Sequence, residues 1–132
     1  MKLEDQVCSL ELAKRLKELG VKQESYFQWE QYEESYEPSV RPCKDMGFHT
    51  EFIAPAFTVA ELGEIMTEAG HGVVSRIGTT ACATLVKKEW WVTGGNWLPE
   101  KQKYDHLETS EKWADALAKM LIHLIEKGIV KV

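Results

Sequence analysis

The last apolar segment, roughly Ser110 to Lys127, constrains the fold of this chain more than any other stretch. Its apolar residues recur at three- and four-residue steps, which is the spacing of one face of an α-helix. They are Trp113, Leu117, Met120, Leu121 and Leu124, widened by Ala114, Ala118, Ile122 and Ile125. This arc spans about half of the helix circumference, which is more than a helix needs to cover one surface. We therefore predict a helix that contacts two surfaces.

Two hypotheses account for the second surface of this helix. In the first, the helix packs on a sheet and is flanked by another helix, as layered domains are built. In the second, part of the arc is a homodimer interface, because symmetric dimers are the commonest oligomers. The residues of that interface are Trp113, Leu117, Leu121, Ile122 and Ile125. His123 lies on the polar border of the arc, where we expect a solvated side chain.

Helix ends are marked at both termini of the chain. Thr109 or Ser110 is the expected N-cap of the last helix, because a side-chain oxygen there accepts a backbone N–H of the first turn. Gly128 is the expected stop, since glycine adopts the left-handed conformation at little cost. An earlier helix is predicted from about Ser9 to Leu19, with Gly20 ending it in the same way.

A third, short helix is predicted to begin at Thr58. Thr58 and Glu61 have the spacing of a capping box, in which each side chain binds the backbone N–H of the other residue. Phe57 and Leu62 have the spacing of a hydrophobic staple across the same helix start. We expect the helix to end by Gly70.

Between the helices, the sequence favours strands. Alternation of apolar and polar residues over Ser25–Tyr32 predicts a half-buried strand. Shorter strands are expected around Ser39–Arg41 and Phe48–Ile53, and more strands over Val73–Thr93. Gly94-Gly95 is a strong turn pattern.

The residues from Asn96 to Leu107 then form a polar return to the last helix. This order of elements predicts one α+β domain over residues 1–132. Its small antiparallel sheet has three to five strands and is covered by the N- and C-terminal helices, with one further short helix.

Charge and composition restrict the functions of the chain. A net charge of −5 argues against the basic patch that nucleic-acid binding requires. No apolar run approaches the roughly 20 residues that span a membrane, and the N-terminus has no apolar signal region. Three widely spaced cysteines, Cys8, Cys43 and Cys82, fit free thiols in a reducing compartment. We therefore expect a cytoplasmic protein without a membrane partner.

Aromatic residues provide the clearest candidates for a binding surface. Trp90 and Trp91 occupy successive strand positions and so face opposite sides of the sheet. One of them is expected to join the core. The other is either covered by a loop or helix or exposed as a binding anchor, because tryptophan is enriched at interface hot spots. The predicted binding surface consists of Trp90, Trp91, Tyr26, Tyr32 and Trp97.

The polar residues predict no metal site and no cofactor. Zinc sites use closely spaced pairs of cysteine or histidine, and this chain has no two such pairs. One alternative function is a small enzyme with a Cys–His dyad in a loop-lined pocket, formed from Cys43 or Cys82 with His49, His71 or His106. A second alternative is a nucleic-acid-binding accessory protein, because the first helix and Gly20 superficially match half of a helix-turn-helix.

Three stretches of the chain together resemble a known protein family. They are Val7–Ser25, Ala56–Met66 and Ala116–Lys127, and Trp90–Val92 adds to the resemblance. With these segments, most of the chain is similar to a family of small uncharacterised proteins encoded by phages and prophages. The resemblance implies a cytoplasmic accessory protein of a mobile element and brings no activity or catalytic residue. We therefore expect a protein-binding or self-associating module without catalysis, with a protein partner or a homodimer and an unknown small-molecule preference.

Overall fold

The computed structural model describes residues 2–33, 37–43, 50–69, 74–82 and 85–132, with the backbone alone for 74–82 and 85–88. A short 3₁₀ turn over Leu3–Asp5 opens the chain. The helices are α1 (Leu10–Glu18), α2 (Val59–Glu68) and α3 (Trp113–Glu126). The strands are β1 (Phe27–Gln31), β2 (Ser39–Pro42), β3 (Glu51–Pro55), β4 (Val74–Cys82), β5 (Leu85–Leu98) and β6 (Lys103–Ser110).

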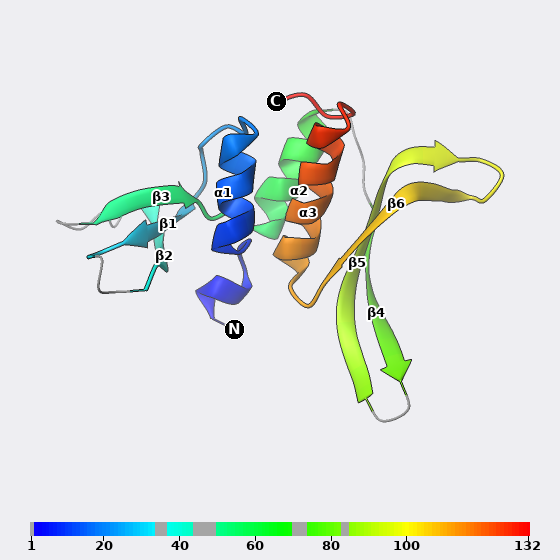
Figure 1. Ribbon diagram of the computed structural model, residues 1–132, viewed down its shortest axis with the longest axis horizontal. Helices are drawn as coiled ribbons and strands as arrows, with labels where there is room; N and C mark the ends of the chain where they lie inside the picture. Colours follow the sequence, from blue (N-terminus) through cyan, green and yellow to red (C-terminus); the bar gives the residue numbers. More distant parts are fainter. Residues whose placement is uncertain (1, 34–36, 44–49, 70–73, 83–84) are drawn as a thin grey trace.

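The helices form a layer between two antiparallel sheets (Figure 1). One sheet has the strand order β2–β1–β3 and adjoins α1, while the other has the order β4–β5–β6 and adjoins α3. The predicted α+β class is confirmed. The strands make two sheets where we predicted one, because the N-terminal helix covers one sheet and the C-terminal helix covers the other.

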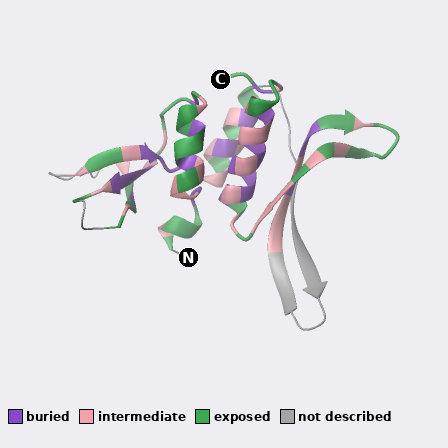
Figure 2. Cartoon of the chain, viewed as in Figure 1, coloured by how far each residue is buried: buried purple, intermediate pink, exposed green. Residues whose placement is uncertain are grey.

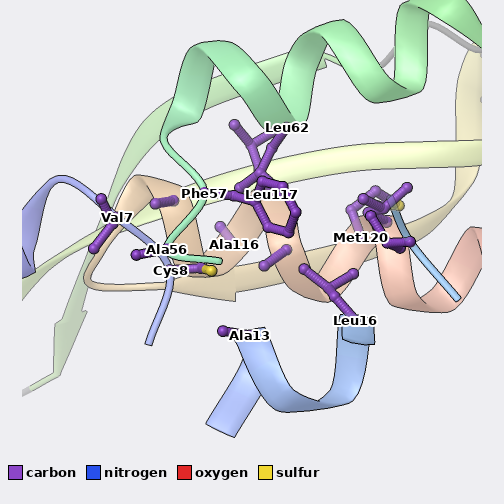
Figure 3. Packing of buried hydrophobic residues seen from close by; sticks show 14 of the residues in the cluster. Val7, Cys8, Ala13, Leu16, Ala56, Phe57, Leu62, Ala116, Leu117 and Met120 are labelled. Atoms are coloured by element: carbon purple, nitrogen blue, oxygen red, sulfur yellow. The ribbon is translucent and has the colours of Figure 1, made fainter. Parts of the chain in front are cut away.

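The apolar arc of α3 is filled within a single chain. Leu16 of α1, Leu62 of α2 and Leu121 of α3 are fully buried, and Leu117 is nearly so. Figure 2 shows buried residues along α1 and α3. Figure 3 shows Phe57, Leu62 and Leu117 packed together between the helices. The second surface of α3 is therefore supplied by α1 and α2 on one side and by β5 and β6 on the other. Leu117 and Leu121 are buried within the chain, whereas Trp113, Ile122 and Ile125 are at least partly exposed, so the predicted interface of α3 stays a prediction that depends on these three residues.

The predicted glycine stops are confirmed at two helices. Gly20 and Gly128 have φ values of 88° and 72°, in the left-handed region. Beyond them, the Val21 N–H donates to the Leu16 carbonyl at 3.1 Å, and the Ile129 N–H donates to the Leu124 carbonyl at 2.9 Å. These backward bonds satisfy carbonyls that the last helical turns leave unpaired.

The predicted N-cap of α3, Thr109 or Ser110, is two or three residues too early. Ser110 is the last residue of β6, where it pairs with Trp90, so it is not available as an N-cap. Lys112 takes the N-cap position and makes no side-chain cap bond. The acidic residue of the first turn is Asp115, whose carboxylate accepts the Ser9 N–H at 2.6 Å. A strand that continues to the helix therefore replaces the expected loop.

The start of α2 matches its prediction closely. Thr58 Oγ1 accepts the Glu61 N–H at 3.2 Å, and Glu61 Oε1 accepts the Thr58 N–H at 3.1 Å. Both bonds of the capping box are thus present. Phe57 and Leu62, the staple pair, are fully buried.

The predicted turn at Gly94-Gly95 is wrong, because β5 runs through both glycines to Leu98. The register of β5 on β6 shifts between Gly94 and Trp97, which marks a bulge. Gly95 has a φ of 92°, and a Cβ there would clash with the Asp105 carboxylate. Gly95 therefore permits the close approach of the Asp105 side chain at this bulge, and the polar segment that follows leads into β6.

Strand β1 buries more polar surface than its alternation predicts. Trp29 faces the helices and donates from Nε1 to the Cys8 carbonyl at 3.0 Å, as an inward residue should. Glu30 occupies a polar position of the alternation, yet it is only 2% exposed. Gln28 Nε2 donates to Glu30 Oε2 at 3.1 Å, and Arg41 Nε lies 3.4 Å from Glu30 Oε1. These partners compensate the burial of the carboxylate.

Candidate functional site

Two stacked ring pairs attach the sheet β4–β5–β6 to α3. The indoles of Trp90 and Trp113 are parallel within 3°, with centroids 4.3 Å apart. The imidazoles of His106 and His123 are also parallel within 3°, with centroids 3.4 Å apart. Val92, between these pairs on the same face of β5, is fully buried. Alternate residues of β5 and β6 thus face α3, and the residues between them face the other way.

The opposite face of this sheet is the candidate functional site, which we call the outer face. Its residues lie in two register pairs, Trp91 with Thr109 and Thr93 with Leu107. All helices lie on the other side of the sheet (Figure 1). Leu107 is 48% exposed, and the other three are half-buried. None of these four carries a charge. On the other side of β5, Trp91 pairs with Arg76 of β4, and Glu89 lies two positions before Trp91 on β5, so charged residues border the four.

The end of the β5–β6 hairpin carries a further aromatic pair. Trp97 and Tyr104 face each other across the strands in an edge-to-face contact, with ring centroids 5.2 Å apart. Trp97 is largely exposed. The bulge at Gly94 separates this pair from the outer face, so Trp97 belongs to the tip of the hairpin.

The predicted binding surface is divided between the two sheets. Trp90 faces α3, whereas Trp91 faces outward, as the alternation of strand positions requires. Tyr26 precedes β1 and Tyr32 follows it, which places both at the sheet β2–β1–β3 across the helical layer (Figure 1). They are 77% and 49% exposed. A contact surface that combines Trp91 with Tyr32 is therefore not formed within one chain.

A groove of about 850 Å³ lies beside Tyr26 and runs along one face of α2. Glu61, Glu64 and Glu68 line it. The Glu61 carboxylate is engaged by the capping box and by Ser25 Oγ at 3.1 Å. Glu64 and Glu68 are exposed, so the groove presents solvated carboxylates and has no enclosed polar centre.

A smaller notch of about 260 Å³ lies between the β5–β6 hairpin and the end of α3. His106 Nε2 is 2.8 Å from Glu108 Oε1. Burial, with the nearby His106 and Lys127, lowers the pKa of His123 below its usual 6.5. The Asn96 N–H donates to Asp105 at 2.9 Å and lowers the pKa of that carboxyl.

The histidine pair was not anticipated from the sequence. His123 was expected to be solvated, but its ring is covered by His106. The two residues are 17 positions apart in a strand and a helix, and no spacing rule connects them. Only the position of His123 at the border of the apolar arc hinted at a covered ring.

The thiols described here are poor nucleophiles. Burial raises the pKa of Cys8 to about 12. Burial, with Glu61 and Glu30 nearby, also raises the pKa of Cys43, whose Sγ lies 3.1 Å from the Ser25 carbonyl oxygen. Since the thiolate is the reactive form, neither site favours nucleophilic catalysis. The side chains of Cys82, His49 and His71, which the dyad hypothesis also used, lie outside the described residues.

Comparisons with family models, with curated proteins and with solved structures find no match for this chain. Among the residues that the structure describes, no three His, Cys, Asp or Glu side chains are grouped to hold a metal ion. None of the described helices combines the length and apolar character needed to cross a membrane. The surfaces of the molecule itself are therefore the basis for a functional proposal.

Proposed function

We propose that this chain is a self-associating protein-binding module whose contact surface is the outer face of the sheet β4–β5–β6. The observation that carries the proposal is the group of four uncharged residues that β5 and β6 pair on this face, Trp91, Thr93, Leu107 and Thr109, with Leu107 48% exposed. An antiparallel sheet with one solvated face normally places polar residues on that face. A tryptophan and a leucine at its centre favour a covered surface instead.

A second copy of the chain suits this face for two reasons. Two-fold dimers place the same patch against itself, so a charged patch would oppose like charges. The β5–β6 register pairs of the outer face are uncharged. The residues that border Trp91, Arg76 on β4 and Glu89 on β5, carry opposite charges, so a two-fold contact need not oppose like charges. Tryptophan is also enriched among residues that contribute most to binding, which makes Trp91 the expected anchor. Nucleic acid is a poorer candidate, because the chain has a net charge of −5.

The wider role that we propose is that of an accessory protein of a mobile element, acting in the cytoplasm. Its support is the similarity to phage and prophage proteins in Val7–Ser25, Ala56–Met66 and Ala116–Lys127. A small module that assembles through one sheet face and lacks an activated thiol among its described residues is compatible with such a role.

Sedimentation velocity over a concentration series tests the proposal. We compare the wild type with Leu107→Lys and with the control Tyr32→Lys, whose side chain is equally exposed on the other sheet. A lysine in a closed apolar contact is expected to weaken self-association at least tenfold, or about 1.4 kcal/mol. The control should associate as the wild type does. A monomeric wild type, or an effect of Tyr32→Lys alone, would overturn the proposal.

A further inference from the structure

The two ring pairs between the sheet and α3 differ in whether their rings can be protonated. Trp90 and Trp113 keep the same charge at every pH, so their stack is independent of pH. His106 and His123 each gain a proton in acid. Their rings are parallel with centroids 3.4 Å apart, which leaves no room for water between them. The attachment of β6 to α3 thus includes a contact whose charge varies near neutral pH.

The charged groups around the histidine pair come from both packed elements. From α3, Lys127 lines the notch one turn after His123. From β6, Glu108 binds His106 Nε2 at 2.8 Å, and Asp105 lies at the rim, where its carboxylate is held by the Asn96 N–H.

A further cation on α3, Lys119, is directed away from the pair, because its Nζ donates to the Thr109 carbonyl at 3.1 Å. The single carboxylate bonded to the pair, that of Glu108, neutralises one imidazolium. A second imidazolium then faces Lys127 and the first ring without a bonded anion among the described residues.

We propose that the stacked His106–His123 pair is a pH-sensitive latch between β6 and α3, closed while one ring is neutral and released once both rings are protonated. Two unit charges 3.4 Å apart repel enough to shift an equilibrium about eightfold, even at the dielectric constant of bulk water. Burial, His106 and Lys127 lower the pKa of His123, so the surroundings of this ring oppose its protonation. On release, the Trp90–Trp113 stack remains as the hinge.

Release would change the hairpin more than the helical core. The core residues of α1, α2 and α3 are buried between the helices and do not depend on the histidine contact (Figure 3). Strand β6 is the edge of its sheet, and its contacts with α3 include the histidine pair and the bond from Lys119. The latch therefore controls how firmly the β5–β6 hairpin is held, whatever binds to the outer face.

Amide hydrogen exchange at pH 7.5 and pH 5.0, corrected for the intrinsic exchange rates, tests the latch. We expect the opening equilibrium for residues 103–110 to rise about eightfold in acid, while the amides of α1 and α2 change much less. His123→Phe keeps an aromatic ring against His106 without a charge, so this variant should lose the acid-dependent opening. His106→Phe provides the same test from β6 if the first variant, on α3, fails to fold.

Two results would overturn the latch. The first is an acid-dependent opening of β6 that persists unchanged in the folded phenylalanine variant. The second is a wild-type protein whose protection falls evenly along the chain, or not at all, between the two pH values. The second result is obtained from the wild-type protein alone, so the latch can be refuted even if neither phenylalanine variant folds.

Discussion

Replacing Glu61 by alanine should destabilise the fold more than any other single change on the exposed side of α2. One carboxylate accepts four hydrogen bonds, from Thr58 N–H, Thr58 Oγ1, Ser25 Oγ and Tyr26 N–H, at 3.0 to 3.2 Å. It therefore caps α2 and fixes the chain that enters β1. The Tyr26 N–H is near water and can be solvated after the change, whereas the Thr58 N–H is half-buried.

The expected loss follows from these contacts. A bond from a partly buried N–H to a charged acceptor contributes about 1.5 kcal/mol, and weakening an N-cap costs about 1 kcal/mol. Together they predict a loss of about 2.5 kcal/mol. With a urea m-value of about 2 kcal/mol/M, the unfolding midpoint should fall by about 1.2 M.

Two variants control for other effects of the substitution. Glu64→Ala makes the same chemical change one turn further along α2 at an exposed position, and it should cost less than about 0.5 kcal/mol. Glu61→Gln keeps an acceptor for the capping box and should lose about half of the full effect. Equal midpoints for Glu61→Ala and Glu64→Ala would refute the assignment of Glu61 as the link between α2 and β1.

Three further predictions concern the thiols, the histidine pair and the indole stack. With a pKa raised to about 12, Cys8 should resist iodoacetamide in the folded protein at pH 8, and rapid labelling would contradict its burial. The pKa of His123 is lowered on folding, so the unfolded chain binds more protons than the folded chain below about pH 6.5. The urea midpoint of the wild type should therefore fall as the pH drops from about 6.5. The midpoint of His123→Phe should fall less over the same range. Trp113→Ala removes the stack on Trp90, which contributes about 0.5–1.5 kcal/mol beyond the burial of the ring. The loss of unfolding free energy, measured with urea, should therefore be larger for Trp113→Ala than for Trp97→Ala, whose side chain is more exposed. Equal losses for the two variants would contradict a stabilising stack.

Local features of this fold were predictable from the sequence. The capping box of Thr58 and Glu61 and the glycine stops at Gly20 and Gly128 depend on residues within one helical turn of each other. Such contacts form wherever the helix forms, so their spacing alone identifies them. The wide arc of α3 likewise predicted two contact surfaces, and the structure supplies both within the chain.

Features that join distant segments were not predictable. The strands of residues 27–55 and 74–110 form separate sheets, and nothing in their alternation shows which strands share an edge. Gly94-Gly95 has the composition of a turn, yet the same backbone freedom serves a bulge. The stack of His106 on His123 depends on how β6 crosses α3. The candidate site therefore required the tertiary structure, although Trp91 itself was selected from the sequence.

A dilution series monitored by amide chemical shifts tests the central claim most directly, because it locates a self-contact without any substitution. If the chain associates through the outer face, the amide chemical shifts should depend on concentration and change most at Trp91, Thr93, Leu107 and Thr109. Shifts concentrated at Tyr26 and the sheet β2–β1–β3, or spectra that do not change up to millimolar concentration, would contradict it.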